Sequence, residues 1–151
     1  MPRCTHSPAL VPHATERLRQ DERKITGPRR LILETLCHNA HPMTRKEIFS
    51  RMPQGSCNLA TVYRALHLLE DAGLVKQYDF GDGIARYEFQ TDEQASHHHH
   101  LICTRCASVA KVEACFPREW QEQIAQENGY EQVTHRLEFF GVCPACARKT
   151  D

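Results

Sequence analysis

The sequence has no apolar run of membrane-spanning length and no apolar signal segment at its N-terminus. We therefore expect a cytoplasmic protein with no membrane partner. The 151 residues also carry no net formal charge, so no overall basic character points to nucleic acid. Neutral charge does not exclude nucleic acid, because binding needs only a local basic face. The composition, 40% apolar and 25% charged, is typical of a globular protein with one medium domain or two small ones.

Half of the eight cysteines form two Cys-x-x-Cys pairs in the C-terminal third. Four sulfur ligands are the set that a closed tetrahedral zinc site needs. Disulfides suit small secreted chains, and they are disfavoured here because no signal segment is present. The pairs predict a structural Zn(II) site made by Cys103, Cys106, Cys143 and Cys146. The unpaired cysteines, Cys4, Cys37, Cys57 and Cys115, are interpreted as ordinary small residues.

The N-terminal half of the sequence predicts a series of helices. Pro28 suits the first turn of one helix, where Arg29 and Arg30 oppose the helix dipole and so indicate a phosphate partner. Thr44 and Glu47 fit a capping box at the start of a short helix. The most regular helix runs from near Asn58 to Gly73, with apolar residues at helical spacing on one face. Two helices joined by a tight turn, the second with a polar face near its start, predict a helix-turn-helix.

Two strand-like segments, 74–78 and 84–89, follow the helices and are joined at Phe80-Gly81-Asp82-Gly83. Asp-Gly between such segments is a strong hairpin signal. Helices followed by a hairpin make a winged helix, and the alternative is a small helical bundle that carries an extra hairpin. The polar stretch 90–96 is interpreted as a hinge. We therefore predict an α+β protein with a winged-helix DNA-binding domain over 1–92 and a metal-binding domain over 93–151.

The C-terminal part predicts a small α/β unit. Segments 97–103 and 108–113 are strand-like, and a helix is expected from Pro117 to near Gly129 with Trp120 and Ile124 facing inward. Apolar residues alternate from Val133 to Phe139, which predicts a half-buried strand. His135 falls on the apolar face of that strand, where a packed histidine and a metal ligand are both reasonable interpretations.

Four consecutive histidines open the first of these strands, His97 to His100. Successive side chains on a strand point to opposite faces, so His98 and His100 share one face while His97 and His99 share the other. The run could therefore serve two metal sites. Imidazole with carboxylate ligands suits Fe(II), Mn(II) or Zn(II). Glu88, just before the hinge, is placed to join such a site as a bridging ligand, and metal binding would then shift the population of domain arrangements.

These motifs together resemble the ferric uptake regulator family of bacterial metal-responsive repressors. The resemblance runs from about Arg17 to the C-terminus and rests on four stretches: Lys24-Ile25-Thr26-x-x-Arg29, Leu59 to Arg64, His97 to Cys103-x-x-Cys106, and Gly141-Val142-Cys143-x-x-Cys146. It implies a homodimer with a winged helix and a dimerisation domain in each chain. It also implies metal-dependent binding to AT-rich inverted repeats of double-stranded operator DNA, with repression of metal-uptake or peroxide-stress genes.

The resemblance also implies ligands, and it matches the Cys-x-x-Cys pairs to the structural zinc site. The usual strand carboxylate falls on Lys111 and the usual helix glutamate on Arg118, so neighbouring acidic residues are taken instead. His41 lies about one residue out of register with the family's histidine ligand. The regulatory site is then expected to comprise His41, Glu88, His98, His100 and Glu113, and a second site His97, His99, His135 and Glu119, with Glu122 as an alternative to Glu119.

The same resemblance implies the DNA contacts. Tyr63 is expected to touch thymine methyl groups, and Arg64 a phosphate or a base edge. Thr61 lies in the same motif, and Lys24, Arg29 and Arg30 are expected to add charge contacts. The alternative for Tyr63 and Arg64 is a solvated helix face.

Several functional alternatives remain at this stage. Glutamate at position 88 favours iron or manganese, whereas the histidine run fits the zinc-uptake branch of the family equally well. A zinc enzyme built on His98, His100 and Glu88 is disfavoured because no H-E-x-x-H base motif is present, so we expect no catalysis. A metal-buffering or interaction module without operator binding is the remaining alternative.

Overall fold

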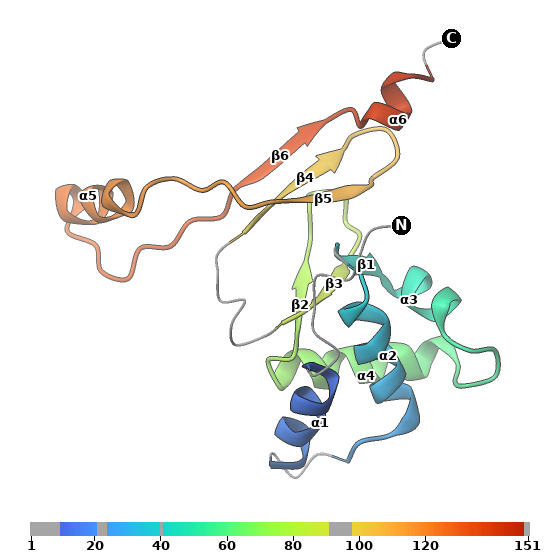
Figure 1. Cartoon of the computed structure of the whole chain (residues 1–151). Helices are drawn as coiled ribbons and strands as arrows, with labels where there is room; N and C mark the ends of the chain where they lie inside the picture. Colours follow the sequence, from blue (N-terminus) through green and yellow to red (C-terminus); the bar gives the residue numbers. More distant parts are fainter. Residues whose placement is uncertain (1–9, 21–23, 40, 91–97, 150–151) are drawn as a thin grey trace. The chain divides into compact units, whose positions relative to one another are not determined.

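The computed structural model describes residues 10–20, 24–39, 41–90 and 98–149, and the chain divides into two compact units, 1–95 and 96–151. Helices and two three-stranded sheets make an α+β fold, as predicted (Figure 1). In the N-terminal unit the elements are α1 Leu10–Gln20, α2 Gly27–Cys37, β1 Met43–Thr44, α3 Arg45–Arg51, α4 Leu59–Asp71, β2 Val75–Tyr78 and β3 Arg86–Phe89. In the C-terminal unit they are β4 His99–Cys103, β5 Val109–Val112, α5 Arg118–Asn128, β6 Glu138–Gly141 and α6 Pro144–Ala147.

The helices of the N-terminal unit pack through apolar faces with helical spacing. α2 begins at Gly27 with Pro28 in its first turn, as predicted, where a missing N–H breaks no intrahelical hydrogen bond. Its buried side chains face α4, and the core of the unit gathers residues from all four helices and from the sheet. The fully buried members with the largest side chains are Leu18, Ile32, Leu33, Leu36, Ile48, Val62, Leu66 and Leu69.

The helix-turn-helix is formed by α3 and α4, and its ends are capped as predicted. The Thr44 hydroxyl accepts from the Glu47 N–H while the Glu47 carboxylate accepts from the Thr44 N–H, which completes the capping box. The Asn58 side chain accepts from the Thr61 N–H at the start of α4. At the other end Gly73 takes a positive φ of 66° and its N–H reaches the Glu70 carbonyl, so glycine is required there.

The wing is the hairpin of β2 and β3, with β1 on the other edge of β3. The predicted hairpin is confirmed, and its second strand begins at Arg86, two residues later than expected, so residues 79–85 connect the strands. The Asp82 carboxylate accepts two hydrogen bonds from the Arg86 guanidinium, at 3.0 and 2.7 Å. These hydrogen bonds lower the pKa of Asp82 to about 2. The buried Arg86 thus fixes the tip of the wing from within its own strand.

The C-terminal sheet has the order β5-β4-β6, with β4 antiparallel to β5 and parallel to β6 (Figure 1). Two predictions are wrong here. The strand expected from Val133 to Phe139 begins only at Glu138, and Trp120 and Ile124, expected to face inward, are 51% and 43% exposed. α5 has no buried residue within this chain, so the apolar spacing of Trp120 and Ile124 is not matched by a covering surface here.

None of the helices in the described segments has the length and apolar content of a membrane span.

Candidate metal centres and nucleic-acid interface

The two Cys-x-x-Cys pairs meet at one end of the C-terminal sheet. Cys103 ends β4 opposite Gly141, the last residue of β6, so the parallel pairing of these strands brings the two pairs together. Each pair forms a tight turn, with the Ala107 N–H on the Cys103 carbonyl at 2.9 Å and the Cys146 N–H on the Cys143 sulfur at 3.4 Å. The ligand atoms of this Cys4 cluster, namely Cys103, Cys106, Cys143 and Cys146, all lie within 4.8 Å of one another.

The geometry and electrostatics of the Cys4 cluster fit zinc. A Zn–S bond of about 2.3 Å in a tetrahedron separates two sulfurs by roughly 3.8 Å, and the sulfurs of Cys106 and Cys143 are 3.7 Å apart. Hydrogen bonds from the backbone N–H groups of Cys143, Cys106 and Arg105 lower the pKa of Cys103 to about 6. Sulfur contacts with Cys106 and Cys143 raise the pKa of Cys146 to about 12. Because crowded thiolates repel one another, a divalent cation is the natural partner, and the cluster is suited to structural zinc.

His98 and His100, expected in the regulatory site, lie together at the start of β4. Their ring centroids are 5.1 Å apart, and the planes of the two rings are nearly perpendicular. The two rings lie close together, as expected for alternate residues on one face of a strand. Lys111 lies directly opposite His100 on β5, so a cation occupies the position where a carboxylate was expected. Glu113 follows β5 and is exposed.

The other two residues assigned to the regulatory site belong to the N-terminal unit. Glu88 is a buried residue of β3 and pairs across the sheet with Lys76. His41 is exposed and lies just before β1.

A second group of ligand atoms joins His99, Cys115 and His135, all within 4.8 Å of one another. Burial and the neighbouring His135 lower the pKa of His99, which favours the neutral imidazole that binds metal. Of the residues predicted for this site, His97 lies outside the described residues. Glu119 is exposed in the first turn of α5 and is not in the group.

Cys115 was interpreted from the sequence as an ordinary small residue, yet its sulfur lies 3.1 Å from His135 Nε2. Sequence spacing gives no signal for it, because the three residues of the group lie far apart along the chain.

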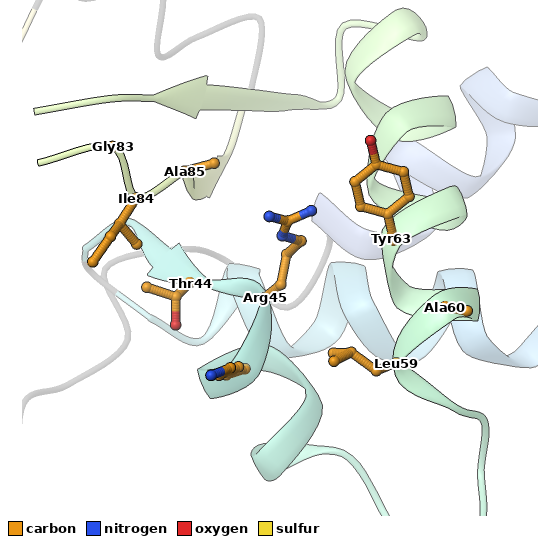
Figure 2. Close-up of a pocket in the computed structure, with 9 residues that line it drawn as sticks. Thr44, Arg45, Leu59, Ala60, Tyr63, Gly83, Ile84 and Ala85 are labelled. Atoms are coloured by element: carbon orange, nitrogen blue, oxygen red, sulfur yellow. The ribbon is translucent and has the colours of Figure 1, made fainter. Parts of the chain in front are cut away.

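The polar face of α4 lies opposite its buried face of Val62, Ala65, Leu66 and Leu69. Tyr63 is 47% exposed, and Arg64 is exposed beside it. The Arg45 guanidinium, from the start of α3, lies 4.9 Å from the centre of the Tyr63 ring in a cation–π contact. Arg45 and Tyr63 border a pocket of about 600 Å³ (Figure 2). It is lined by Thr44, Arg45, Lys46, Leu59, Ala60, Tyr63, Gly83, Ile84 and Ala85, from α3, α4 and the wing.

The remaining residues expected to contact DNA have partners in the chain. The Thr61 hydroxyl donates to the Asn58 side chain at 2.9 Å, so it contributes to the helix cap. Arg29 donates to the Lys24 carbonyl, and Arg30 pairs with Glu34 at 2.8 Å on the exposed surface. Lys24 takes part through that backbone carbonyl, and the residue itself is exposed.

Arg45 and Lys46 were not predicted from the sequence to have a function. They are two consecutive cations in the first turn of α3, where they oppose the helix dipole. The argument that singled out Arg29 and Arg30 applies equally to this pair and could have found it.

A model of the ferric uptake regulator family matches residues 20–140 of this chain. The ferric uptake regulation protein of Bacillus subtilis is 31% identical over 137 residues, covering 89% of this chain and 92% of that protein. The peroxide operon regulator of the same organism is 34% identical over 139 residues, covering 90% and 92%.

Solved structures agree with these sequence matches. The ferric uptake regulator of Vibrio cholerae superposes with a TM-score of 0.71 at 29% identity, over 85% of this chain and 98% of that one. A zinc-bound manganese uptake regulator superposes with a TM-score of 0.69 at 34% identity, over 86% and 98%. The family model covers most of the chain, relatives above 30% identity match nearly all of it, and the chain belongs to the ferric uptake regulator family.

Proposed function

We propose that this chain is a metal-dependent transcriptional repressor that binds AT-rich inverted repeats of double-stranded DNA as a homodimer. Structural Zn(II) in the Cys4 cluster stabilises the C-terminal unit, and a regulatory Fe(II), Mn(II) or Zn(II) ion switches DNA affinity. Relatives named for iron, manganese and peroxide-operon regulation support the metal dependence.

The observation that carries the DNA-binding part is the exposed face at the start of α4. Tyr63 and Arg64 are not needed for the core, because the opposite face of α4 supplies the buried residues. A helix in the major groove reads bases with side chains near its N-terminal end. The Tyr63 ring offers an apolar contact for thymine methyl groups, and Arg64 and Arg45 supply charge for phosphates or guanine edges.

The regulatory site is proposed from residue types and positions along the chain. Glu88 belongs to the N-terminal unit, and His98 and His100 belong to the C-terminal unit. An ion that takes ligands from both units binds best to one arrangement of them, so its binding favours that arrangement. His41 and Glu113 are the further ligands we propose.

The homodimer is supported by the apolar residues that the C-terminal unit leaves exposed. β6 is an edge strand of its sheet, and Phe139 and Phe140 on it are 41% and 56% exposed. An apolar edge strand is a pairing surface that folded proteins normally cover. A second copy of the same chain would cover both edges at once through a two-fold axis.

The test is DNA affinity measured by fluorescence anisotropy at fixed salt. The protein keeps zinc in its Cys4 cluster and is otherwise stripped by chelator, then titrated with Mn(II), Fe(II) or Zn(II) in the presence of an AT-rich inverted repeat. We expect one ion to tighten binding at least tenfold and chelator to reverse the effect. A shuffled duplex of the same composition gives the non-specific background.

Two variants separate the metal switch from the DNA surface. His98→Ala should abolish the metal response while leaving weak DNA binding, and His13→Ala, an exposed histidine on α1, should change neither. Absence of specific binding with every ion would contradict the repressor and favour a metal-buffering module. High affinity that no ion alters would contradict the metal switch alone.

A further inference from the structure

The group of His99, Cys115 and His135 is drawn from three separate segments of the C-terminal unit. His99 begins β4, Cys115 lies between β5 and α5, and His135 lies between α5 and β6. The distance from the Cys115 sulfur to His135 Nε2 is 3.1 Å, and the ring centroids of His99 and His135 are 5.2 Å apart. Ligand atoms this close can share one ion at bond lengths of about 2.0–2.3 Å.

Each histidine of this group is oriented by a hydrogen bond through its ring. Gln121 donates its amide N–H to the Val133 carbonyl, so its amide oxygen is the atom that faces His135. That oxygen only accepts, and it lies 2.8 Å from His135 Nδ1, which therefore carries the proton. The lone pair of Nε2 is then left facing Cys115.

The ring of His99 is oriented in the same way, by a hydrogen bond to the backbone of Leu137. Hydrogen bonds of this kind fix the tautomer and direction of histidines that bind metal.

We propose that Cys115 is the thiolate ligand of a second metal site with His99 and His135. This site prefers a thiophilic divalent ion such as Zn(II) or Co(II) to Mn(II) or Fe(II). On binding, the Cys115 thiol loses its proton to solvent and a metal–sulfur bond forms. Sulfur ligands favour zinc and cobalt over manganese, whereas a carboxylate in the same position favours the harder ions.

The proposal gives the chain two sites of different chemistry besides the Cys4 cluster. The proposed regulatory ligands are all nitrogen or oxygen, whereas this site contains sulfur. Zinc or cobalt would therefore fill it under conditions in which the regulatory site exchanges iron or manganese. The assignment does not depend on DNA binding, so either proposal can fail without the other.

Cobalt absorbance tests the thiolate directly. The Cys4 cluster is loaded with zinc, which is spectroscopically silent, and one zinc per chain is verified by metal analysis. Co(II) is then added. Cobalt at the regulatory site produces no sulfur-to-cobalt charge-transfer band, because that site has no sulfur. We expect a near-ultraviolet charge-transfer band that saturates at one cobalt per chain through Cys115.

Matched variants should either remove the charge-transfer band or keep it. Cys115→Ser should remove the band, while Cys57→Ser, the substitution of a partly buried cysteine of the N-terminal unit, should keep it. Cys115→Asp should remove the band and narrow the preference for Zn(II) over Mn(II) measured by competition. Gln121→Ala should keep the band but weaken cobalt binding about 10–100-fold, because His135 loses the partner that orients it.

Three results would overturn the assignment. The first is no charge-transfer band in the wild-type protein, and the second is a band that survives in Cys115→Ser. The third is zinc released in step with the band, which would place the cobalt in the Cys4 cluster instead.

Discussion

The two units of this chain reach stability by different routes. Among its described residues, the N-terminal unit has a core of 19 buried residues, from Val11 to Phe89. In the described part of the C-terminal unit the buried apolar residues are Ile102, Cys103 and Val109. That unit also exposes a larger apolar set, namely Leu101, Phe116, Trp120, Ile124, Tyr130, Phe139, Phe140 and Val142. The first unit therefore has a core sufficient to fold alone, whereas the second has little core of its own and would depend on metal and on the second chain that we propose.

The exposed aromatic residues differ in the same way. In the N-terminal unit Tyr63 is exposed on a helix that already has a full buried face, so its exposure adds a surface for binding. In the C-terminal unit α5 has no buried residue at all, so Trp120 and Ile124 are left uncovered within this chain. Under the proposed function, exposure serves DNA recognition in one unit and pairing with a second chain in the other. The five predictions below test this difference.

Loss of metal from the Cys4 cluster should have the largest effect. Structural zinc contributes roughly 10 kcal/mol or more to the folding of small domains with little core. A strong chelator should therefore unfold the C-terminal unit and leave the N-terminal helices intact. Trp120 is the single tryptophan of the chain and lies in the affected unit, so its fluorescence reports that unit, while circular dichroism reports the remaining helices.

Cys57→Ser is the control for this experiment, because it removes a cysteine outside the cluster. It should respond to chelator as the wild type does. Unchanged tryptophan emission and an unchanged thermal transition after zinc is removed would show that the C-terminal unit folds without metal.

A cavity in the N-terminal core should destabilise the N-terminal unit and spare the C-terminal unit, the opposite of zinc removal. Leu66 is fully buried on α4, and Leu66→Ala should lower the free energy of unfolding by about 2–5 kcal/mol. Chemical denaturation should show an earlier loss of helix, with the zinc content and the Trp120 signal unchanged at low denaturant. If both units lost structure at the same lowered midpoint, they would be one cooperative unit and the contrast would be wrong.

Charge on the edge strand β6 should break the dimer. Phe140→Asp places a carboxylate where we propose that the partner chain packs, and a central interface residue contributes about 2 kcal/mol or more. We expect dimerisation to weaken about 30-fold or more, measured by sedimentation as a function of concentration. Thr134→Asp, at an exposed position outside the strands, is the control. Equal dimerisation in both variants would remove β6 from the interface.

Tyr63→Ala should weaken binding to the inverted repeat by about 1–3 kcal/mol per site and leave the thermal stability of the N-terminal unit unchanged. Tyr63→Phe keeps the ring and loses the hydroxyl. It should bind nearly as the wild type does if the ring contacts thymine methyl groups. An equal loss on the inverted repeat and on shuffled DNA would contradict a base contact by Tyr63.

Most of the N-terminal fold could be predicted because its signals are local. The capping box at Thr44, the Asn58 cap and the Gly73 terminus are each set by a few neighbouring residues. The same holds for the Cys4 cluster, where the spacing within each pair fixes both sulfurs. The failures lie where burial comes from elsewhere: Trp120 follows an apolar pattern that this chain alone does not cover.

Tertiary contacts account for the functional residues that the sequence did not reveal. Cys115 has no metal-ligand spacing and meets His135 only because the segments on either side of α5 return to the same place. Arg45 was assigned no role from the sequence, and its contact with Tyr63 depends on how α3 packs beside α4. Local patterns therefore predict elements and closely spaced ligands, whereas groups assembled from distant segments need coordinates.

The smallest expected effect concerns Arg45. It tests whether Arg45 orients the Tyr63 ring before DNA binds. An exposed cation–π contact contributes about 0.5–1 kcal/mol, so Arg45→Ala should weaken specific binding by about that amount. If Arg45 acts by holding the Tyr63 ring in place, its removal from Tyr63→Ala costs nothing further, and the two losses are not additive. If Arg45 instead contacts a phosphate, the losses add, and the slope of log affinity against log salt falls by about one unit for each chain. A double-mutant cycle in anisotropy, repeated at several salt concentrations, distinguishes these outcomes.

A non-additive result extends the contrast between the units. The N-terminal unit would then orient its exposed residues before any partner binds, whereas those of the C-terminal unit would become ordered through the second chain that we propose.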